Sequence, residues 1–200
     1  MTNNILLENY KSVKLPKSFY LENTPEVARN LIGKVIVRVS NGELLTGIIN
    51  ETEAYLSEGD LASHSAFGMT NRNSAMFCEG SMLYVYKIYG VHHCINAVTE
   101  GEGIGAAVLI RSIIPVQGIN IMMMNRKTES IKNLCNGPGK LTQALDININ
   151  HNKLSLLSDE IFISDYNSIA NPTIISSRRI GITKSTELEL RFNFKTPDST

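Results

Sequence analysis

The sequence of 200 residues lacks tryptophan, has only three cysteines and contains no apolar run near the roughly 18–20 residues of a membrane-spanning helix. Cys78, Cys94 and Cys135 are odd in number and form no CxxC pair. This argues against a disulfide framework and against a structural zinc site, and it favours a reducing compartment. The N-terminus lacks the basic and then apolar order of a secretory signal. We therefore expect a cytoplasmic protein that does not enter a membrane.

An excess of either charge is also absent. The 19 basic and 19 acidic residues give a net charge of zero, which excludes a strongly basic nucleic-acid-binding coat. The charges are nevertheless segregated, because residues 51–100 hold six acidic and two basic side chains, whereas residues 103–128 hold three basic and no acidic ones. Any phosphate binding would rest on a few placed side chains and backbone N–H groups. On charge alone, a solvated surface is the favoured interpretation.

Local signals predict one α+β domain over residues 1–200, with a curved antiparallel β-sheet and short surrounding helices. Thr24-Pro25-Glu26 begins a helix that Gly33 ends, and Asn41-Gly42 is a strong hairpin turn between two strands. The first 15 residues are polar and mixed, so we expect a loose N-terminal arm. Further strands are expected at 82–88, 93–99, 106–113, 160–164, 173–176 and 187–194, and short helices at 116–124 and up to residue 144.

Residues 56–80 have no clear periodicity, and a loop of this length in a compact domain is usually functional or disordered. Its specific polar content favours a functional loop: His64, Ser65, Thr70, Asn71, Arg72 and Asn73.

Glu51, Glu53 and Tyr55 alternate along a predicted strand and therefore share one face. Two carboxylates and a phenol suit general acid–base chemistry, in which one carboxylate activates water. An exposed strand face with ordinary charges is the alternative. Arg111 interrupts an apolar strand and needs a partner, because an unpaired buried charge is costly. Glu51 or Glu53 is the natural partner, unless Arg111 lies on an edge strand and extends into solvent.

Aromatic residues form a second cluster. Tyr84 and Tyr86 share a strand face and Tyr89 follows at a glycine turn, where a side chain is hard to explain as core. Aromatic side chains can stack on bases or wedge between them, but tyrosine is also common in packed strands. The histidines match no zinc-binding spacing, so no metal site is expected.

Several segments occur in one order that, taken together, is highly specific. They are ETEAY at 51–55, DLASHS at 60–65, TNRN at 70–73, MF at 76–77, LYVYKIYG at 83–90, Asn96, AVLIR at 107–111 and NGPGKL at 136–141. In these segments the chain resembles the methylpurine (3-methyladenine, alkyladenine) DNA glycosylase family, over roughly residues 24–194. Asn71 departs from the proline common in the family at this position.

The resemblance implies base excision repair without a metal or other cofactor. Such enzymes flip a damaged purine out of double-stranded DNA and hydrolyse its N-glycosidic bond with water, which leaves an abasic site. The lesions would be 3-methyladenine, 7-methylguanine, hypoxanthine or ethenoadenine. By resemblance, Glu53 is the general base, Arg111 holds the water and Glu53, and the backbone carbonyl of Ile180 is a second water acceptor. We further expect a nucleoid-associated monomer.

The resemblance also implies how the base is held. Tyr55, His64 and Tyr86 would sandwich the flipped base, Tyr89 would fill the gap left in the DNA, and Asn96 would crowd the amino group of guanine. Further DNA contacts are expected from Thr70, Arg72, Val91, His92 and Lys140.

Three other functions stay open. A bifunctional enzyme could also nick DNA through a Schiff base on Lys140, a role that competes with a simple phosphate contact. A lesion-binding protein could flip bases without cleaving them, although the presence of Glu53 and Arg111 argues against it. A small-molecule nucleosidase would have no use for Tyr89 as a wedge.

Overall fold

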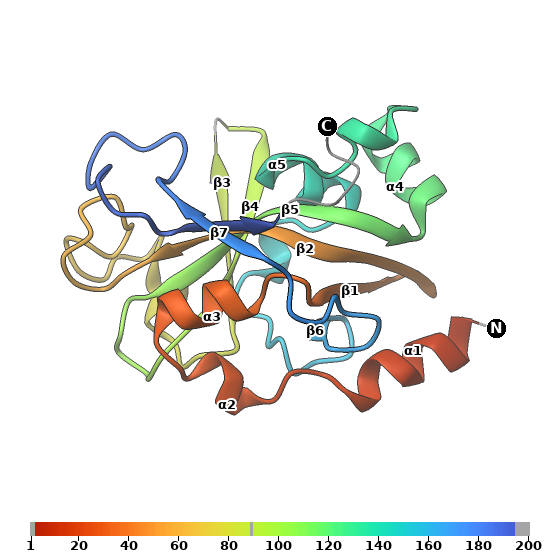
Figure 1. Ribbon diagram of the computed structural model, residues 1–200, viewed down its shortest axis with the longest axis horizontal. Helices are drawn as coiled ribbons and strands as arrows, with labels where there is room; N and C mark the ends of the chain where they lie inside the picture. Colours follow the sequence, from red (N-terminus) through yellow and green to blue (C-terminus); the bar gives the residue numbers. More distant parts are fainter. Residues whose placement is uncertain (1–2, 89, 195–200) are drawn as a thin grey trace.

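The computed structural model describes residues 3–88 and 90–194. Within these ranges, eight strands form one antiparallel sheet in the order β3-β4-β5-β2-β1-β6, with β8 paired to β2 and β7 paired to β8. The sheet curves into a half-barrel, and short helices and long loops surround it (Figure 1). The predicted single α+β domain with a curved antiparallel sheet is confirmed.

The elements have the following bounds. The strands are β1 (Val35–Ser40), β2 (Glu43–Tyr55), β3 (Leu83–Ile88), β4 (His92–Val98), β5 (Ala107–Gln117), β6 (Ile161–Ser164), β7 (Ile174–Ser177) and β8 (Arg191–Phe194). The α-helices are α1 (Asn3–Ser12), α2 (Lys17–Tyr20), α3 (Thr24–Asn30), α4 (Ile119–Arg126) and α5 (Pro138–Ala144). Single 3-10 turns are η1 (Ser74–Phe77), η2 (Ile131–Asn133) and η3 (Ile149–His151).

Strand β2 is the central element of the sheet. The Asn41-Gly42 turn that precedes it has both residues at positive φ, 51° and 80°, as a two-residue hairpin turn requires. The first half of β2 pairs with β1, its last third pairs with β8, and β5 runs along its other edge. The register with β5 shifts around Glu51, which marks an irregularity at this end of the strand. The last residues of β2 therefore lie between β5 and β8.

The N-terminal segment differs from the expectation of a loose arm. Residues 3–12 form helix α1, and Tyr10 is buried against Val35, Val37 and Phe162 on one face of β1 and β6. The Ser164 hydroxyl donates a hydrogen bond to the Tyr10 carbonyl at 2.7 Å. Leu6 and Leu7 also pack here, at helical spacing from Tyr10, so a short apolar face anchors a segment whose composition is mostly polar.

Two other boundaries differ from the predictions. Strand β5 extends to Gln117, and helix α4 begins only at Ile119, because Gly118 adopts a left-handed conformation (φ 75°) between them. Strand β8 is confined to residues 191–194, whereas 188–190 have no regular structure. The helix predicted from Thr24 is confirmed as α3, with Asn23 as its N-cap.

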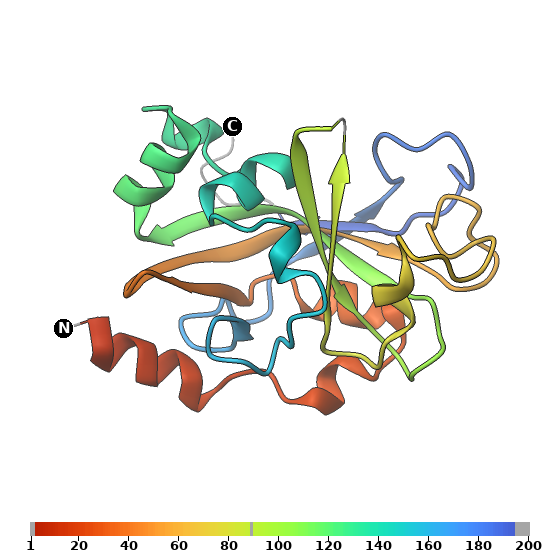
Figure 2. The same ribbon diagram turned by 180° about the vertical axis from the view of Figure 1, so that it is seen from behind.

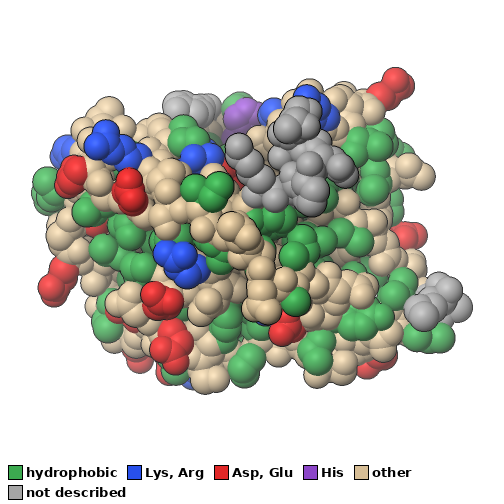
Figure 3. Space-filling model, viewed as in Figure 1, with side chains coloured by type: hydrophobic (Ala, Val, Ile, Leu, Met, Phe, Trp, Pro, Cys, Tyr) green, Lys and Arg blue, Asp and Glu red, His purple; other side chains and the backbone are tan. Residues whose placement is uncertain are grey.

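The loops that follow β2 and β7 lie side by side at one end of the molecule (Figures 1 and 2). The β3–β4 hairpin projects beyond the rest of the sheet, next to α5 (Figure 2). Basic and acidic side chains are interspersed over the face in Figure 3 and form no single basic patch there. Among the described residues, no helix is both long enough and apolar enough to cross a membrane.

Candidate functional site

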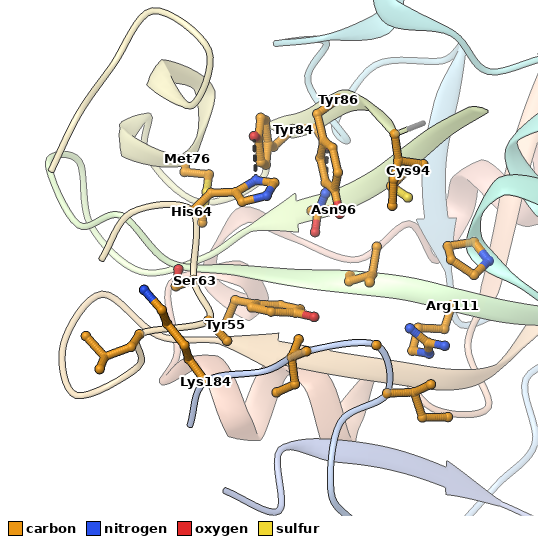
Figure 4. Close-up of a pocket in the computed structure, with 18 of the residues that line it drawn as sticks. Tyr55, Ser63, His64, Met76, Tyr84, Tyr86, Cys94, Asn96, Arg111 and Lys184 are labelled. Atoms are coloured by element: carbon orange, nitrogen blue, oxygen red, sulfur yellow. Dashed lines mark hydrogen bonds between the residues drawn. The ribbon is translucent and has the colours of Figure 1, made fainter. Parts of the chain in front are cut away.

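A cavity of about 700 Å³ opens between the loop after β2, the strands β3 and β4, and the loop after β7. Its volume lies in the range of small-ligand sites. The cavity brings together six residues predicted to act in catalysis or base binding: Tyr55, His64, Tyr86, Asn96, Arg111 and Ile180. Figure 4 shows the Tyr55 ring across the cavity from His64 and Tyr86.

Glu53 lies directly behind this wall and has no exposed surface. Its Oε1 accepts a hydrogen bond from the Ile180 backbone N–H at 2.8 Å, and its Oε2 accepts one from the Tyr55 hydroxyl at 2.9 Å. Arg111 Nη1 is 3.3 Å from Oε2. Burial raises the pKa of Glu53, and Arg111, the Ile180 amide and Tyr55 oppose that rise by stabilising the carboxylate. A carboxylate with a raised pKa beside a cavity is typical of a proton acceptor in a reactive site.

Arg111 finds its partners as expected, and it pairs with both carboxylates. Its Nε is 2.9 Å from Glu51 Oε1, which also accepts from Arg191 Nε at 2.6 Å. Strand β5 supplies Arg111, β2 supplies both glutamates, and β8 supplies Arg191. Arg191 on β8 therefore balances the charge of Glu51. This leaves Arg111 on β5 to balance the charge of Glu53.

Aromatic rings form the other wall. His64 and Tyr86 meet edge to face with ring centroids 4.6 Å apart, and Tyr84 stacks on Tyr86 at 5.2 Å. His64 Nδ1 is hydrogen-bonded to the Tyr84 hydroxyl at 2.9 Å. Burial lowers the pKa of His64, and the positive charge of Arg72 lowers it further, by a smaller amount. The imidazole is thus neutral near pH 7 and offers a flat, uncharged surface to a ligand. Asn96 donates from Nδ2 to the Tyr84 carbonyl at 3.0 Å, which fixes its amide.

The residues expected to contact DNA are dispersed. Arg72 lines the cavity, with its guanidinium 5.9 Å from the Tyr86 ring centroid, whereas Thr70 is bonded to the Asn73 side chain outside it. Val91, in the turn before β4, and His92, the first residue of β4, are both exposed, and the ammonium of Lys140 donates to Asn136. Tyr89 lies outside the described residues.

Sequence reasoning missed three groups near the cavity. Cys94 is buried in its lining, and burial raises the pKa of its thiol. Asp60 and Arg179 form a buried ion pair behind Tyr55. Asp60 lies in the DLASHS segment that carries the resemblance and Arg179 directly precedes Ile180, but no local pattern in the sequence paired the two. Within residues 3–88 and 90–194, no three His, Cys, Asp or Glu side chains are grouped as metal ligands would be.

Comparison with known families assigns the sequence to a family of DNA glycosylases. The methylpurine-DNA glycosylase family matches residues 18–198, nearly the whole chain. The chain belongs to this family.

Curated relatives agree with that assignment. A protein of Chlorobium phaeobacteroides named "Putative 3-methyladenine DNA glycosylase" is 47% identical over 176 residues, which cover 88% of either chain. A protein of Prosthecochloris aestuarii with the same name is 46% identical, over 86% of this chain and 83% of its own. One from Francisella tularensis is 43% identical, over 86% of this chain and 90% of its own.

Proposed function

We propose that this protein is a monofunctional DNA repair glycosylase. It flips an alkylated or deaminated purine out of double-stranded DNA into the cavity and hydrolyses the N-glycosidic bond. The observation that carries the proposal is the buried carboxylate of Glu53, held by three residues that line an aromatic cavity. Family membership supports the same reaction class.

Base recognition follows from the cavity walls. A flipped purine enters between Tyr55 on one side and His64 and Tyr86 on the other, as the arrangement in Figure 4 suggests. Methylated purines such as 3-methyladenine are cationic, so the faces of electron-rich rings attract them more than neutral bases. The fixed amide of Asn96 stands at the cavity wall, where it crowds the exocyclic amino group of guanine.

Catalysis is assigned to Glu53, Arg111 and Ile180. Glu53 takes a proton from the attacking water, and Arg111 and the Ile180 backbone orient that water. Glu53 has no exposed surface in the described state, and the Ile180 N–H occupies its Oε1. Ile180 is 49% exposed, and on this proposal its N–H moves away from Glu53 Oε1 in the substrate-bound state, so that water reaches the carboxylate.

For a cationic methylated purine the remaining chemistry needs only one carboxylate, whereas a neutral purine such as hypoxanthine must also gain a proton as its N-glycosidic bond breaks. The sugar passes through an oxocarbenium-like state, which the negative charge of Glu53 stabilises, and a cationic purine is already a good leaving group. Tyr89, which follows β3 in the sequence, fills the space that the flipped base leaves, and a side chain wedged into the stack offsets part of the cost of unstacking. Thr70, Arg72, Val91, His92 and Lys140 contact the DNA around it.

The lyase alternative receives little support from the geometry. Lys140 does not line the cavity, and its ammonium is bonded to Asn136 at 2.8 Å. A lysine that forms a Schiff base must reach the sugar of the flipped nucleotide. Lys184 does line the cavity, so the test below includes a trap for any lysine adduct.

The test is a single-turnover excision assay in EDTA. The substrates are duplex oligonucleotides with one hypoxanthine, one ethenoadenine or no lesion, together with methylated genomic DNA. We expect release of free damaged bases, intact strands until alkaline cleavage, no adduct after borohydride reduction, and no inhibition by free nucleosides. Binding of the lesion duplex without base release would replace this proposal with a lesion-binding protein, and a borohydride-trapped adduct would replace it with a lyase.

A further inference from the structure

A buried ion pair between Asp60 and Arg179 lies behind the cavity wall and takes no part in the roles assigned above. Arg179 Nη1 and Nη2 are 2.6 and 2.7 Å from Asp60 Oδ2 and Oδ1, and neither side chain has any exposed surface. Two parallel bonds of this kind fix orientation as well as distance. Buried ion pairs are often no more stabilising than well-packed apolar residues, so stability alone does not account for this one.

The pair joins three segments that build one side of the cavity. Asp60 accepts hydrogen bonds from the backbone N–H groups of Leu56 and Ala62, both at 3.1 Å. Arg179 Nη1 also donates to the carbonyl of Ala54 at 2.9 Å. The end of β2, the loop that follows it and the loop after β7 are therefore held together at one buried point.

Two groups that face the reaction depend on these segments. The guanidinium of Arg179 is 4.6 Å from the Tyr55 ring centroid, while Tyr55 lines the cavity and Arg179 does not. The next residue, Ile180, donates its N–H to Glu53. The loop itself has few other anchors, because residues 180, 181, 183 and 184 are all exposed. Arg179 is buried, so it fixes the base of this otherwise exposed loop.

We propose that Asp60 and Arg179 are positioning residues that align the Tyr55 ring and the Ile180 backbone with Glu53. The inference rests on the proposed function and deepens it. Tyr86 and the expected DNA contacts Val91, His92 and Lys140 belong to segments that the pair does not touch, and His64, Thr70 and Arg72 lie further along the loop that Asp60 anchors. Loss of the pair therefore slows the chemical step much more than it weakens lesion binding. A misplacement of about 1 Å at a reacting centre can cost about 10²-fold in rate.

The test compares two variants with one matched control. Asp60→Asn keeps the shape of the side chain and removes its negative charge. Arg179→Lys keeps the positive charge and removes the two parallel hydrogen bonds that the guanidinium donates. Arg38→Lys is the control, because Arg38 is also buried (6% exposed) and pairs with a carboxylate, Glu160, on a part of the sheet that does not line the cavity. Single-turnover excision, lesion-duplex affinity and thermal unfolding are measured for each, at temperatures equally far below each midpoint.

We expect both site variants to lose about 10²-fold in excision rate at saturating enzyme, with lesion-duplex affinity within about threefold of wild type. Arg38→Lys should lose stability without losing the excision rate. Equal losses of rate in all three variants, or parallel losses of rate and affinity in Asp60→Asn, would mean that the pair is structural and would overturn the inference.

Hydrogen exchange of residues 178–185 provides a readout that does not need activity. The Ile180 amide should be protected in wild type and in Arg38→Lys, and it should exchange faster in Asp60→Asn. Unchanged exchange in Asp60→Asn refutes the positioning role. Faster exchange in that variant, combined with a wild type that releases no base, refutes the proposed function and leaves the positioning role standing.

Discussion

Replacement of Arg111 by methionine removes the cation that pairs with the buried carboxylate of Glu53. At the observed 3.3 Å and an effective dielectric constant of about 20, the pair interacts with about 5 kcal/mol. Loss of one partner from a buried pair typically destabilises a protein by about 3–5 kcal/mol. Glu51 contributes little to this cost, because it keeps Arg191 at 2.6 Å. We therefore expect Arg111→Met to be destabilised by about 3–5 kcal/mol at pH 8.

The loss should depend on pH in a defined direction. Burial raises the pKa of Glu53 above its ordinary value of 4.5, and Arg111 opposes that rise, so the variant raises it further. A folded-state pKa above the unfolded one means that ionisation of Glu53 opposes folding. The destabilisation is therefore small below pH 4.5 and grows as the pH rises through the folded-state pKa. Excision of methylated purines should fall sharply at neutral pH and recover in part at higher pH.

Urea unfolding at pH 5 and pH 8, together with a pH profile of single-turnover excision, measures both effects. Arg111→Lys keeps the positive charge. It is measured in the same way, so that the prediction can still be tested if Arg111→Met does not fold. An equal loss of stability at both pH values, together with an unshifted excision profile, would refute the coupling of Arg111 to Glu53.

Three further predictions follow from the same site. Wild-type excision from methylated DNA should rise with pH, with a midpoint above 4.5, because burial raises the pKa of Glu53; a rate that does not change between pH 4 and pH 8 would contradict its role as the base. Tyr55→Phe removes a 2.9 Å hydrogen bond that lowers this pKa, so the midpoint should move upward and the rate should fall by up to about tenfold at pH values below both midpoints. Tyr89→Ala should weaken binding of the lesion duplex about tenfold, as measured by fluorescence anisotropy, and should leave thermal unfolding unchanged.

The central part of the site could be predicted because local pattern and charge both pointed to it. Alternation along one strand placed Glu51, Glu53 and Tyr55 on one face, and the cost of an unpaired buried charge predicted a carboxylate partner for Arg111. The structure confirms that pairing, with both glutamates. The Asn41-Gly42 hairpin was predicted for an equally local reason, its need for two residues at positive φ.

Other features depend on long-range register and could not be predicted. Arg191 reaches Glu51 from 140 positions away, and Arg179 reaches Asp60 from 119 positions away. Both contacts form because the segments around β7 and β8 meet the end of β2. The local sequence of any one of these segments does not predict that meeting. Helix α1 was missed because its anchor is one buried tyrosine in a polar segment, and its helical content is fixed by contacts with β1 and β6.

The most direct test of the account is Glu53→Gln beside wild type on the same methylated or hypoxanthine-containing duplex, in EDTA. Base release and duplex binding are measured in parallel, and circular dichroism verifies the fold. We predict a loss of at least about 10³-fold in single-turnover release, with binding of the damaged duplex retained. A folded Glu53→Gln protein that releases the base at close to the wild-type rate would contradict the account.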